Sequence, residues 1–264
     1  MKSVLCLETF FTEVPFEERF ALAKEAGFEY VEFWTWKAKD LQQIKRLCEE
    51  HGLKVVCFSG DESFSLVDKA EHAQYISFAK ESIEAAKYLG CSKLVIHSNA
   101  LGHDGAVLNH YNNFSAEEKY ANTLAVLKEL ASIAEREQVT FLLEPLNTKV
   151  DHRGNYLAFS KDAAKLIKEV GSANLRILYD AYHMQIMEGN LIGTITEYVD
   201  LIGHIHIADV PGRHEPGTGE INYQQIIKSL QGLGYDRGVG FELFPAGESM
   251  QAATLANDLV SNVK

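Results

Sequence analysis

Eight short apolar segments alternate with longer amphipathic segments along the chain, and this alternation constrains the fold more than any other feature. Each short segment holds five or six residues and is rich in Val, Ile, Leu and Phe. They span residues 4–8, 30–34, 54–58, 93–97, 140–144, 176–180, 204–208 and 238–243. Continuous apolar runs of this length are typical of strands that are buried on both faces, as in a parallel sheet.

The longer segments have the apolar spacing of helices, and most of them end at a glycine. Segments 21–27 and 44–52 place apolar residues three and four positions apart before Gly27 and Gly52. Ser115 and Glu118 have the spacing of a capping box at the start of a helix. Further helices are predicted over 70–89, 115–137, 160–170, 222–230 and 248–263.

A (β/α)8 TIM barrel is the architecture that this pattern favours. The 264 residues divided by eight give 33 residues per βα unit, a natural size for such a unit. No composition break or Pro-rich linker separates two halves, so residues 1–264 are predicted to form one domain. A doubly wound open sheet is the second choice, but the GxGxxG loop expected of its nucleotide-binding forms is absent.

Charge and cysteine usage restrict the partners and the compartment. The 25 basic and 37 acidic residues give a net charge of −12, so we expect no nucleic-acid partner and no anionic membrane surface. No apolar run approaches the length of about 18 residues that a membrane span needs, and Glu8 interrupts any signal-like run. The irregular spacing of four cysteines in or beside apolar segments indicates reduced, buried thiols in a cytoplasmic protein: Cys6, Cys48, Cys57 and Cys91.

Polar residues close the apolar segments, and in such barrels the active site lies at the carboxyl ends of the strands. The last four segments end in FLLEP, ILYDAYH, HIHIAD and GFELF. Their polar residues are Glu144, Asp180, His206 and Glu242. Acidic residues on a solvated surface do not need to follow an apolar strand. The repeated placement of a polar residue at the end of an apolar strand therefore favours one shared site.

Three carboxylates and an imidazole brought together would repel one another and lose hydration unless a cation joined them. We therefore predict that Glu144, Asp180, His206 and Glu242 bind a divalent metal. Mn²⁺ is the first choice for this oxygen-rich set, with Mg²⁺, Co²⁺ or Zn²⁺ as alternatives. Each acid taken alone could instead cap the following helix or pair with an arginine.

Five further histidines are interpreted separately from His206. His183 follows Asp180 by three residues and is predicted to bind a substrate hydroxyl, with a hydrogen bond to a backbone carbonyl as the alternative. His204 is expected to point to the opposite face of its strand from His206 and to pack in the core or against a helix. No role is predicted for the loop histidines His103, His110 and His152.

The remaining candidates for substrate contact lie on the rim. Arg213 stands in a long loop and could hold a carboxylate or a sugar oxygen, or could form an ion pair with Glu215 or Glu220. His97 and Glu8 are predicted to bind substrate or to make hydrogen bonds at their strand ends. An apolar wall against sugar carbons is expected from Trp34, with Trp36 and Phe11 beside it.

Several long motifs carry a resemblance to a known family. FTEVPFEERFALAKEAGFEYVEF, LEPLN, YDAYHMQIMEGN, HIHIADVPGRHEPGTGEINY and GFELFP together resemble the hydroxypyruvate isomerase family of xylose-isomerase-like barrels, over nearly the whole chain. The resemblance implies a metal-supported barrel in which Glu144 and Glu242 are the acid and base, while Asp180 and His206 complete the metal set. Some members have a glutamine in place of His206, and a histidine there resembles the related ketose 3-epimerases.

The expected activity is the movement of a proton next to a carbonyl in a small sugar or 2-oxo acid sugar, such as hydroxypyruvate. The reaction would pass through an ene-diolate that the metal stabilises. The alternatives are a ketose 3-epimerase, a metal-dependent lyase or dehydratase, an abasic-site endonuclease that the negative charge opposes, and a non-catalytic sugar-binding barrel. A small molecule is the expected partner, and a homo-oligomer is possible.

Overall fold

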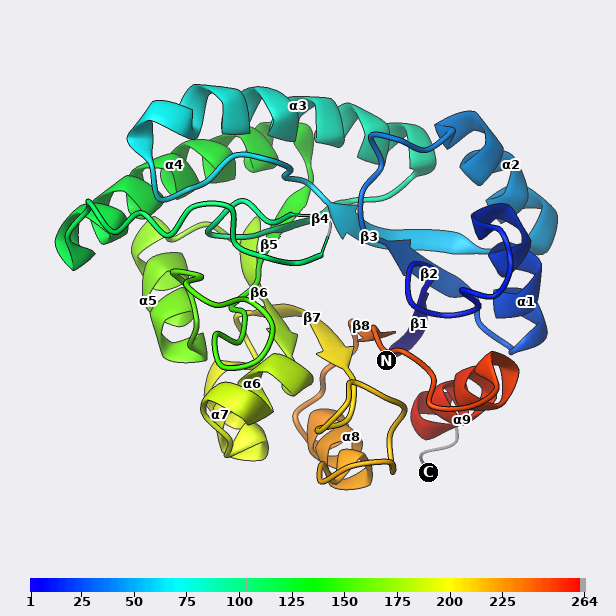
Figure 1. Ribbon diagram of the computed structural model, residues 1–264. Coiled ribbons are helices and arrows are strands. Elements are labelled where there is room, and N and C mark those ends of the chain that lie inside the picture. The colour runs from blue at the N-terminus through cyan, green and yellow to red at the C-terminus, as the bar shows by residue number, and fades with distance from the viewer. Residues whose placement is uncertain (103, 262–264) are drawn as a thin grey trace.

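Eight parallel strands close into a barrel in the computed structural model, which describes residues 1–102 and 104–261 (Figure 1). The strands follow chain order, and β8 pairs with β1 to complete the ring. They are β1 (Lys2–Cys6), β2 (Tyr30–Phe33), β3 (Lys54–Ser59), β4 (Lys93–Ile96), β5 (Thr140–Leu143), β6 (Leu175–Asp180), β7 (Ile202–Ile207) and β8 (Gly238–Phe241). The predicted TIM barrel is confirmed, and each strand overlaps the apolar segment that predicted it.

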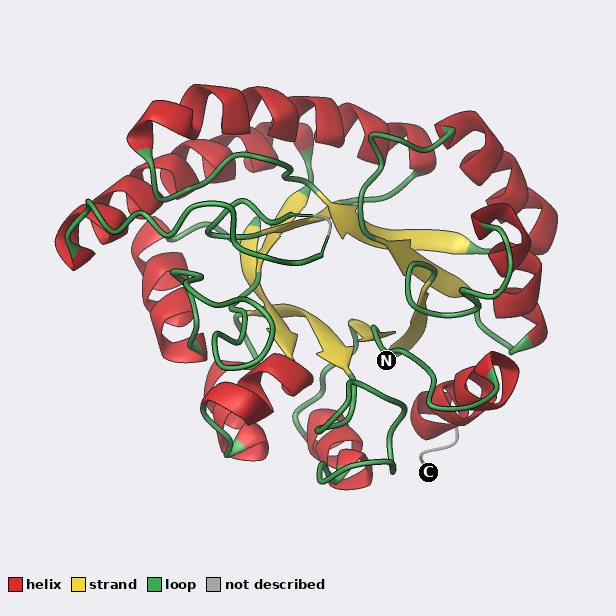
Figure 2. Cartoon of the chain, in the orientation of Figure 1, coloured by secondary structure: helices red, strands yellow, loops and turns green. Residues whose placement is uncertain are grey.

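Helices surround the barrel on its outer side (Figure 2). They are η1 (Phe16–Glu18), α1 (Arg19–Glu25), α2 (Leu41–His51), η2 (Lys69–Glu71), α3 (His72–Leu89), α4 (Ala116–Glu137), α5 (Ser160–Val170), α6 (Ala181–Met187), α7 (Leu191–Tyr198), α8 (Tyr223–Gly232) and α9 (Ser249–Ser261). The capping box of Ser115 and Glu118 opens α4 as predicted. The last two residues of the helix expected over 248–263, together with His103, lie outside the described residues.

Two short helices fill residues 181–198, where the sequence pattern predicts none. Helices α6 and α7 contain seven and eight residues. Gly189 and Asn190 separate them with φ values of 62° and 45°, a left-handed backbone that ends one helix before the next begins. The sixth βα unit therefore has two short helices between β6 and β7 in place of one.

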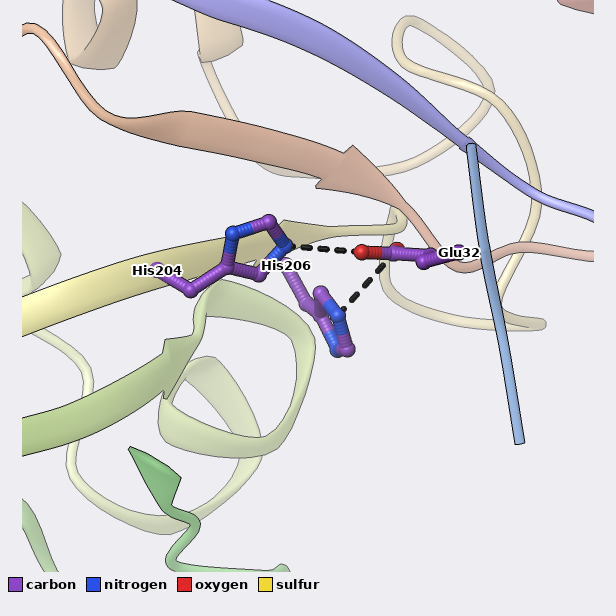
Figure 3. Close-up of side chains that lie close together, drawn as sticks. All are labelled: Glu32, His204 and His206. Carbon is purple, nitrogen blue, oxygen red and sulfur yellow. Dashed lines mark hydrogen bonds and ion pairs between the residues drawn. The ribbon is translucent and has the colours of Figure 1, made fainter. Parts of the chain in front are cut away.

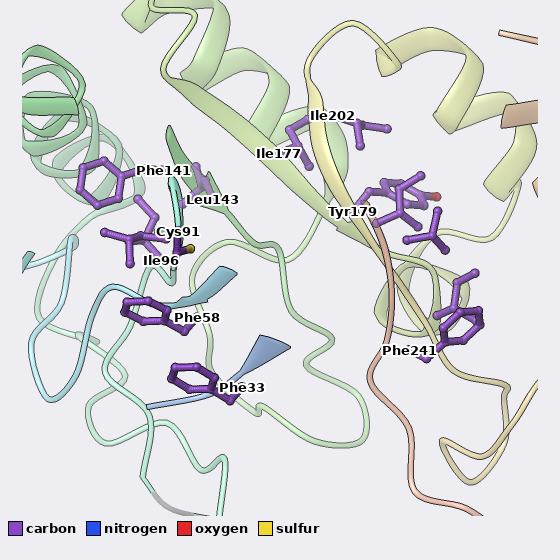
Figure 4. Close-up of a cluster of buried hydrophobic side chains, with 14 of the residues drawn as sticks. Phe33, Phe58, Cys91, Ile96, Phe141, Leu143, Ile177, Tyr179, Ile202 and Phe241 are labelled. Atoms are coloured by element: carbon purple, nitrogen blue, oxygen red, sulfur yellow. The ribbon is translucent and has the colours of Figure 1, made fainter. Parts of the chain in front are cut away.

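The main hydrophobic core lies between the strands and the surrounding helices (Figure 4). Phe141 and Leu143 on β5, and Ile177 and Tyr179 on β6, belong to it. The residues that alternate with them face the barrel interior, because successive strand side chains point to opposite sides. A small second cluster occupies that interior and consists of Cys57, Val95, Leu142 and Leu178.

All four cysteines are buried free thiols, as the sequence indicates.

The longest helix, α4, carries many charged residues along its 22 positions. Within residues 1–102 and 104–261, no helix has the length and apolar character that crossing a membrane requires.

Candidate metal and active site

Four strand-end side chains converge at the carboxyl end of the barrel. Glu144 follows β5, Asp180 ends β6, His206 lies on β7 and Glu242 follows β8. Each offers one ligand atom, and these four atoms all lie within 4.8 Å of one another. All four residues are buried. The structure thus brings together the set that strand-end reasoning selects.

The two carboxylate oxygens of Asp180 have different surroundings. Oδ1 accepts hydrogen bonds from the backbone N–H groups of Tyr182 (2.8 Å) and His183 (3.4 Å), so it caps α6. Oδ2 is buried without a hydrogen bond and lies 3.6 Å from Arg213 Nη2 and 3.4 Å from His183 Nε2. The helix-cap alternative therefore accounts for one oxygen and leaves the other facing the cluster.

The electrostatics of the cluster show opposed effects of burial and charge. Burial raises the pKa of Asp180 to about 7, with Glu144 adding to the rise and Arg213 opposing it. Burial would also raise the pKa of Glu242, but the positive charges of Arg213 and His206 outweigh it and lower that pKa to about 2. Burial alone would lower the pKa of His206, yet the carboxylates of Glu32 and Glu242 raise it well above its ordinary value.

The donor set fits a divalent cation. His206 Nδ1 is buried without a hydrogen bond, although it lies 3.5 Å from Glu242 Oε2 and 3.9 Å from Glu144 Oε1. These distances are longer than those of a hydrogen bond, and they suit ligand atoms arranged around a common ion. Three carboxylates and one imidazole are hard and borderline donors that suit Mn²⁺, Mg²⁺, Co²⁺ or Zn²⁺. Buried His, Glu and Asp side chains can therefore hold a divalent metal here.

The prediction that His204 points away from His206 is wrong. Residues two apart in a strand share a face, and both imidazoles point into the barrel with ring centroids 5.1 Å apart. His204 Nε2 lies 2.8 Å from Glu32 Oε2 in a hydrogen bond. Together with Glu32, the two histidines form a second group with the spacing of metal ligands, directly beside the first.

Arg213 and Trp34 both contact Glu242. The Arg213 guanidinium and the Trp34 indole N–H donate hydrogen bonds to the two oxygens of its carboxylate. The alternative of an ion pair between Arg213 and Glu215 or Glu220 is not what the described residues show, since Arg213 pairs with Glu242 and Asp180. The loop of Arg213 therefore reaches back to the centre of the site.

His183 is fixed by contacts within the protein. Its Nδ1 lies 2.7 Å from Asn147 Nδ2, and its Nε2 faces Asp180 and Glu144 at 3.4 and 4.0 Å. Burial and the positive charge of Arg213 lower the pKa of His183 well below its ordinary value, so the ring is neutral. The loop histidine His152 is buried against this ring with centroids 5.2 Å apart, a neighbour that the sequence pattern did not indicate.

Both ring nitrogens of His97 already have carboxylate partners. Nδ1 lies 3.2 Å from Asp61 Oδ2, and Nε2 lies 3.2 Å from Glu144 Oε2. Burial favours the neutral ring, but Asp61 and Glu144 outweigh it and raise the pKa of His97 to about 10. Asp61 itself is buried and also accepts from the Tyr75 hydroxyl at 3.1 Å. No sequence motif marks Asp61, which lies in the loop beyond β3.

The other predicted rim residues have structural partners. The Glu8 carboxylate forms an ion pair with Lys39. Trp36 donates to Ser82 at 2.9 Å and stacks on Phe78, so it packs against α3. Phe11 is fully buried, which removes it from the predicted apolar wall. Trp34, with 39% of its surface exposed, is the member of that wall that reaches the cluster.

Comparisons with known proteins agree with this architecture. The profile of the family described as xylose isomerase-like TIM barrel matches residues 20–258. Hydroxypyruvate isomerase of Escherichia coli K12 is 34% identical over 247 residues, covering 90% of this chain and 92% of that protein. The 2-oxo-tetronate isomerase of Haemophilus influenzae is 34% identical over 258 residues, covering 92% and 93%.

Among solved structures, the crystal structure of an AP endonuclease, family 2, from Brucella melitensis matches with a TM-score of 0.86 and 29% identity. The match covers 95% of this chain and 96% of that one. The resemblance seen in the sequence motifs is thus confirmed over nearly the full length: the chain belongs to the hydroxypyruvate isomerase family of xylose isomerase-like TIM barrels.

Proposed function

We propose that this protein is a metal-dependent isomerase of a small 2-oxo acid or 2-oxo acid sugar, with hydroxypyruvate and 2-oxo-tetronate as first candidates. The convergence of Glu144, Asp180, His206 and Glu242 at the carboxyl end of the barrel carries the proposal. Relatives named for these two substrates support the substrate class. A bound divalent ion, Mn²⁺ by preference, would polarise the substrate carbonyl and offset negative charge on oxygen. Four unbridged thiols support a reducing, cytoplasmic location.

The two glutamates perform the proton transfers. One removes a proton from the hydroxyl-bearing carbon beside the carbonyl, and the other supplies a proton to the former carbonyl carbon. A further proton passes from the old hydroxyl to the old carbonyl oxygen, so the atoms balance. Both carboxylates are held in place for this work, Glu144 by His97 and Glu242 by Trp34 and Arg213.

Arg213 also has the chemistry to hold the substrate carboxylate. Its guanidinium is a planar, permanently charged donor, and its charge is partly offset by Glu242 and Asp180. The exposed part of Trp34 offers an apolar surface beside Glu242. The neutral His183 ring, whose Nε2 faces Asp180 and Glu144, supplies a polar contact for a substrate hydroxyl.

Replacing Asp209 with asparagine should raise KM about tenfold while kcat changes less. The buried Asp209 carboxylate accepts four backbone N–H bonds of 2.9 to 3.0 Å, which order the loop that carries Arg213; the donors are Val210, Gly217, Gly219 and Ile221. Loss of a charged acceptor costs about 1.5–3 kcal/mol, enough to loosen the loop. Steady-state kinetics test this, with Glu220→Gln on the same loop as control, since Glu220 contacts Gln185. An unchanged KM would contradict the proposed role of Arg213 in substrate binding.

Proton NMR in D₂O tests the proposed function directly. The manganese-loaded enzyme is incubated with hydroxypyruvate, 2-oxo-tetronate and a panel of ketoses, and metal and protein are removed before recording. We expect deuterium at carbon together with a moved carbonyl in a 2-oxo acid. Deuterium at C3 of a ketose with the carbonyl in place would instead assign a 3-epimerase. Loss of a β-substituent would assign a lyase, and no exchange in any compound would reject the proposal.

A further inference from the structure

Three side chains, Glu32, His204 and His206, meet in the barrel interior beside the other proposed metal ligands, joined by one hydrogen bond and one ion-pair contact (Figure 3). Glu32 projects from β2 between His204 and His206 of β7, and it is only 3% exposed. Its Oε2 accepts from His204 Nε2 at 2.8 Å and from Cys57 Sγ at 3.2 Å. Its Oε1 lies 3.2 Å from His206 Nε2. Glu32 thus contacts the one imidazole among the four proposed ligands.

The barrel is shaped to hold these side chains. The interior residues from β3 to β6 are the apolar cluster of Cys57, Val95, Leu142 and Leu178, whereas β2 and β7 place an acid and two imidazoles there. On β8, a Cβ at Gly240 would lie 2.3 Å from Glu32 Oε1, and one at Gly238 would lie 2.4 Å from His204 Nδ1. Only glycine leaves room at these positions. Buried ionisable groups are costly in a core that apolar residues normally fill, which points to a task beyond packing.

The geometry of His206 identifies that task. Its two ring nitrogens face in different directions: Nε2 toward Glu32, and Nδ1 toward Glu242 and Glu144 at 3.5 and 3.9 Å. An imidazole whose proton is on Nε2 has its lone pair on Nδ1, and a carboxylate near Nε2 selects that form. The same carboxylate fixes the rotation of the ring and raises the basicity of the nitrogen that binds the metal.

We propose that Glu32 is the positioning residue of the metal centre: it holds the proton of His206 on Nε2 and thereby aims Nδ1 at the ion. His204 and Cys57 in turn hold Glu32 through its other oxygen. The inference rests on the proposed metal site, and it adds a residue on β2 to a centre otherwise built from strands β5 to β8. Oε2 of Glu32 accepts from His204 and Cys57, whereas Oε1 makes no hydrogen bond and lies 3.2 Å from His206 Nε2, so we assign the trio to the support of a metal ligand.

Metal affinity of purified protein tests this proposal without reference to turnover. The metal-free wild type and Glu32→Gln are titrated with Co²⁺, following its visible absorption, and their thermal unfolding is measured without metal. We expect the dissociation constant for Co²⁺ to rise 10- to 100-fold in Glu32→Gln, with a changed absorption spectrum. Glu188→Gln is the matched control, because it alters a carboxylate away from the cluster whose Oε1 is buried without a hydrogen bond and whose Oε2 accepts from the Ser160 backbone N–H. This control should bind Co²⁺ as the wild type does.

Two additional variants keep the test decisive. His204→Gln leaves the contact of Glu32 with His206 in place, so its affinity should fall less than that of Glu32→Gln. The reverse order would place the ion among Glu32, His204 and His206 and overturn the proposal. If Glu32→Gln does not fold, Glu32→Asp decides, since its shorter side chain keeps the charge but withdraws from His206 and should weaken Co²⁺ binding.

The failure of this inference can be told apart from failure of the proposed function. A wild type that binds no Co²⁺ would reject the metal centre itself. A wild type that binds Co²⁺ with the same affinity and spectrum as Glu32→Gln would leave the metal centre standing and reject the role of Glu32. A lower unfolding temperature of Glu32→Gln with unchanged Co²⁺ binding would assign Glu32 to stability alone.

Discussion

Changing Glu242 to glutamine should lower kcat by about 10³-fold, because the amide can neither accept nor return a proton. The substitution preserves the size of the side chain, and Gln Oε1 can still accept from Trp34 or Arg213, its present partners. We expect the same magnitude for Glu144→Gln. Rates are compared at saturating Mn²⁺, with metal content measured for each variant so that loss of the ion is not mistaken for loss of the acid or base.

Deuterium exchange separates the two glutamates. The variant that lacks the base should lose both exchange of the substrate proton with D₂O and formation of product. The variant that lacks the group returning the proton should still exchange the substrate proton while forming little product. Glu220→Gln, an exposed-loop carboxylate that contacts Gln185, serves as the control and should keep the wild-type rate. A Glu242→Gln enzyme with undiminished kcat would contradict the two-glutamate mechanism.

The fold follows closely from the sequence because buried parallel strands and their helices leave local signals. Every apolar segment became a strand, and the glycine stops at Gly52, Gly90 and Gly171 end helices in the left-handed conformation. Helices α6 and α7, of seven and eight residues, were missed because the segment 181–198 was not interpreted as helical. The boundary between them depends on two backbone angles that residue type only partly determines.

The candidate site, like the fold, has residues that the sequence predicts and residues that it does not. Glu144, Asp180, His206 and Glu242 could be found because strand ends of a barrel meet by topology alone. Asp61 contacts His97, and Glu32 contacts His204. These contacts join segments that are far apart in the chain, so they cannot be predicted from a single sequence. One signal for Glu32 was present, since an acid stood inside an apolar strand, between Val31 and Phe33. Regular alternation would also have placed His204 beside His206.

Removal of the divalent ion should abolish turnover and lower the stability of the fold. Without a cation, the buried carboxylates of Glu144, Asp180 and Glu242 repel one another, and Arg213 offsets only part of their charge. An ion that binds only the folded state stabilises it by about 2.7 kcal/mol at 100 times its dissociation constant. For a chain of this size we expect Mn²⁺ to raise the unfolding temperature by roughly 5 °C or more.

Dialysis against a chelator, followed by measurement of kcat and thermal unfolding before and after Mn²⁺ is restored, tests this expectation. Asp180→Asn is the informative variant: asparagine is a good helix cap and keeps the oxygen that accepts from Tyr182 and His183, so α6 should persist. It replaces Oδ2, which makes no hydrogen bond, by an amide nitrogen, which cannot bind a cation. The Mn²⁺-dependent rise in unfolding temperature should therefore vanish in Asp180→Asn while Glu220→Gln retains it. Full turnover by the chelated wild type would show that the clustered carboxylates serve a reaction that needs no metal.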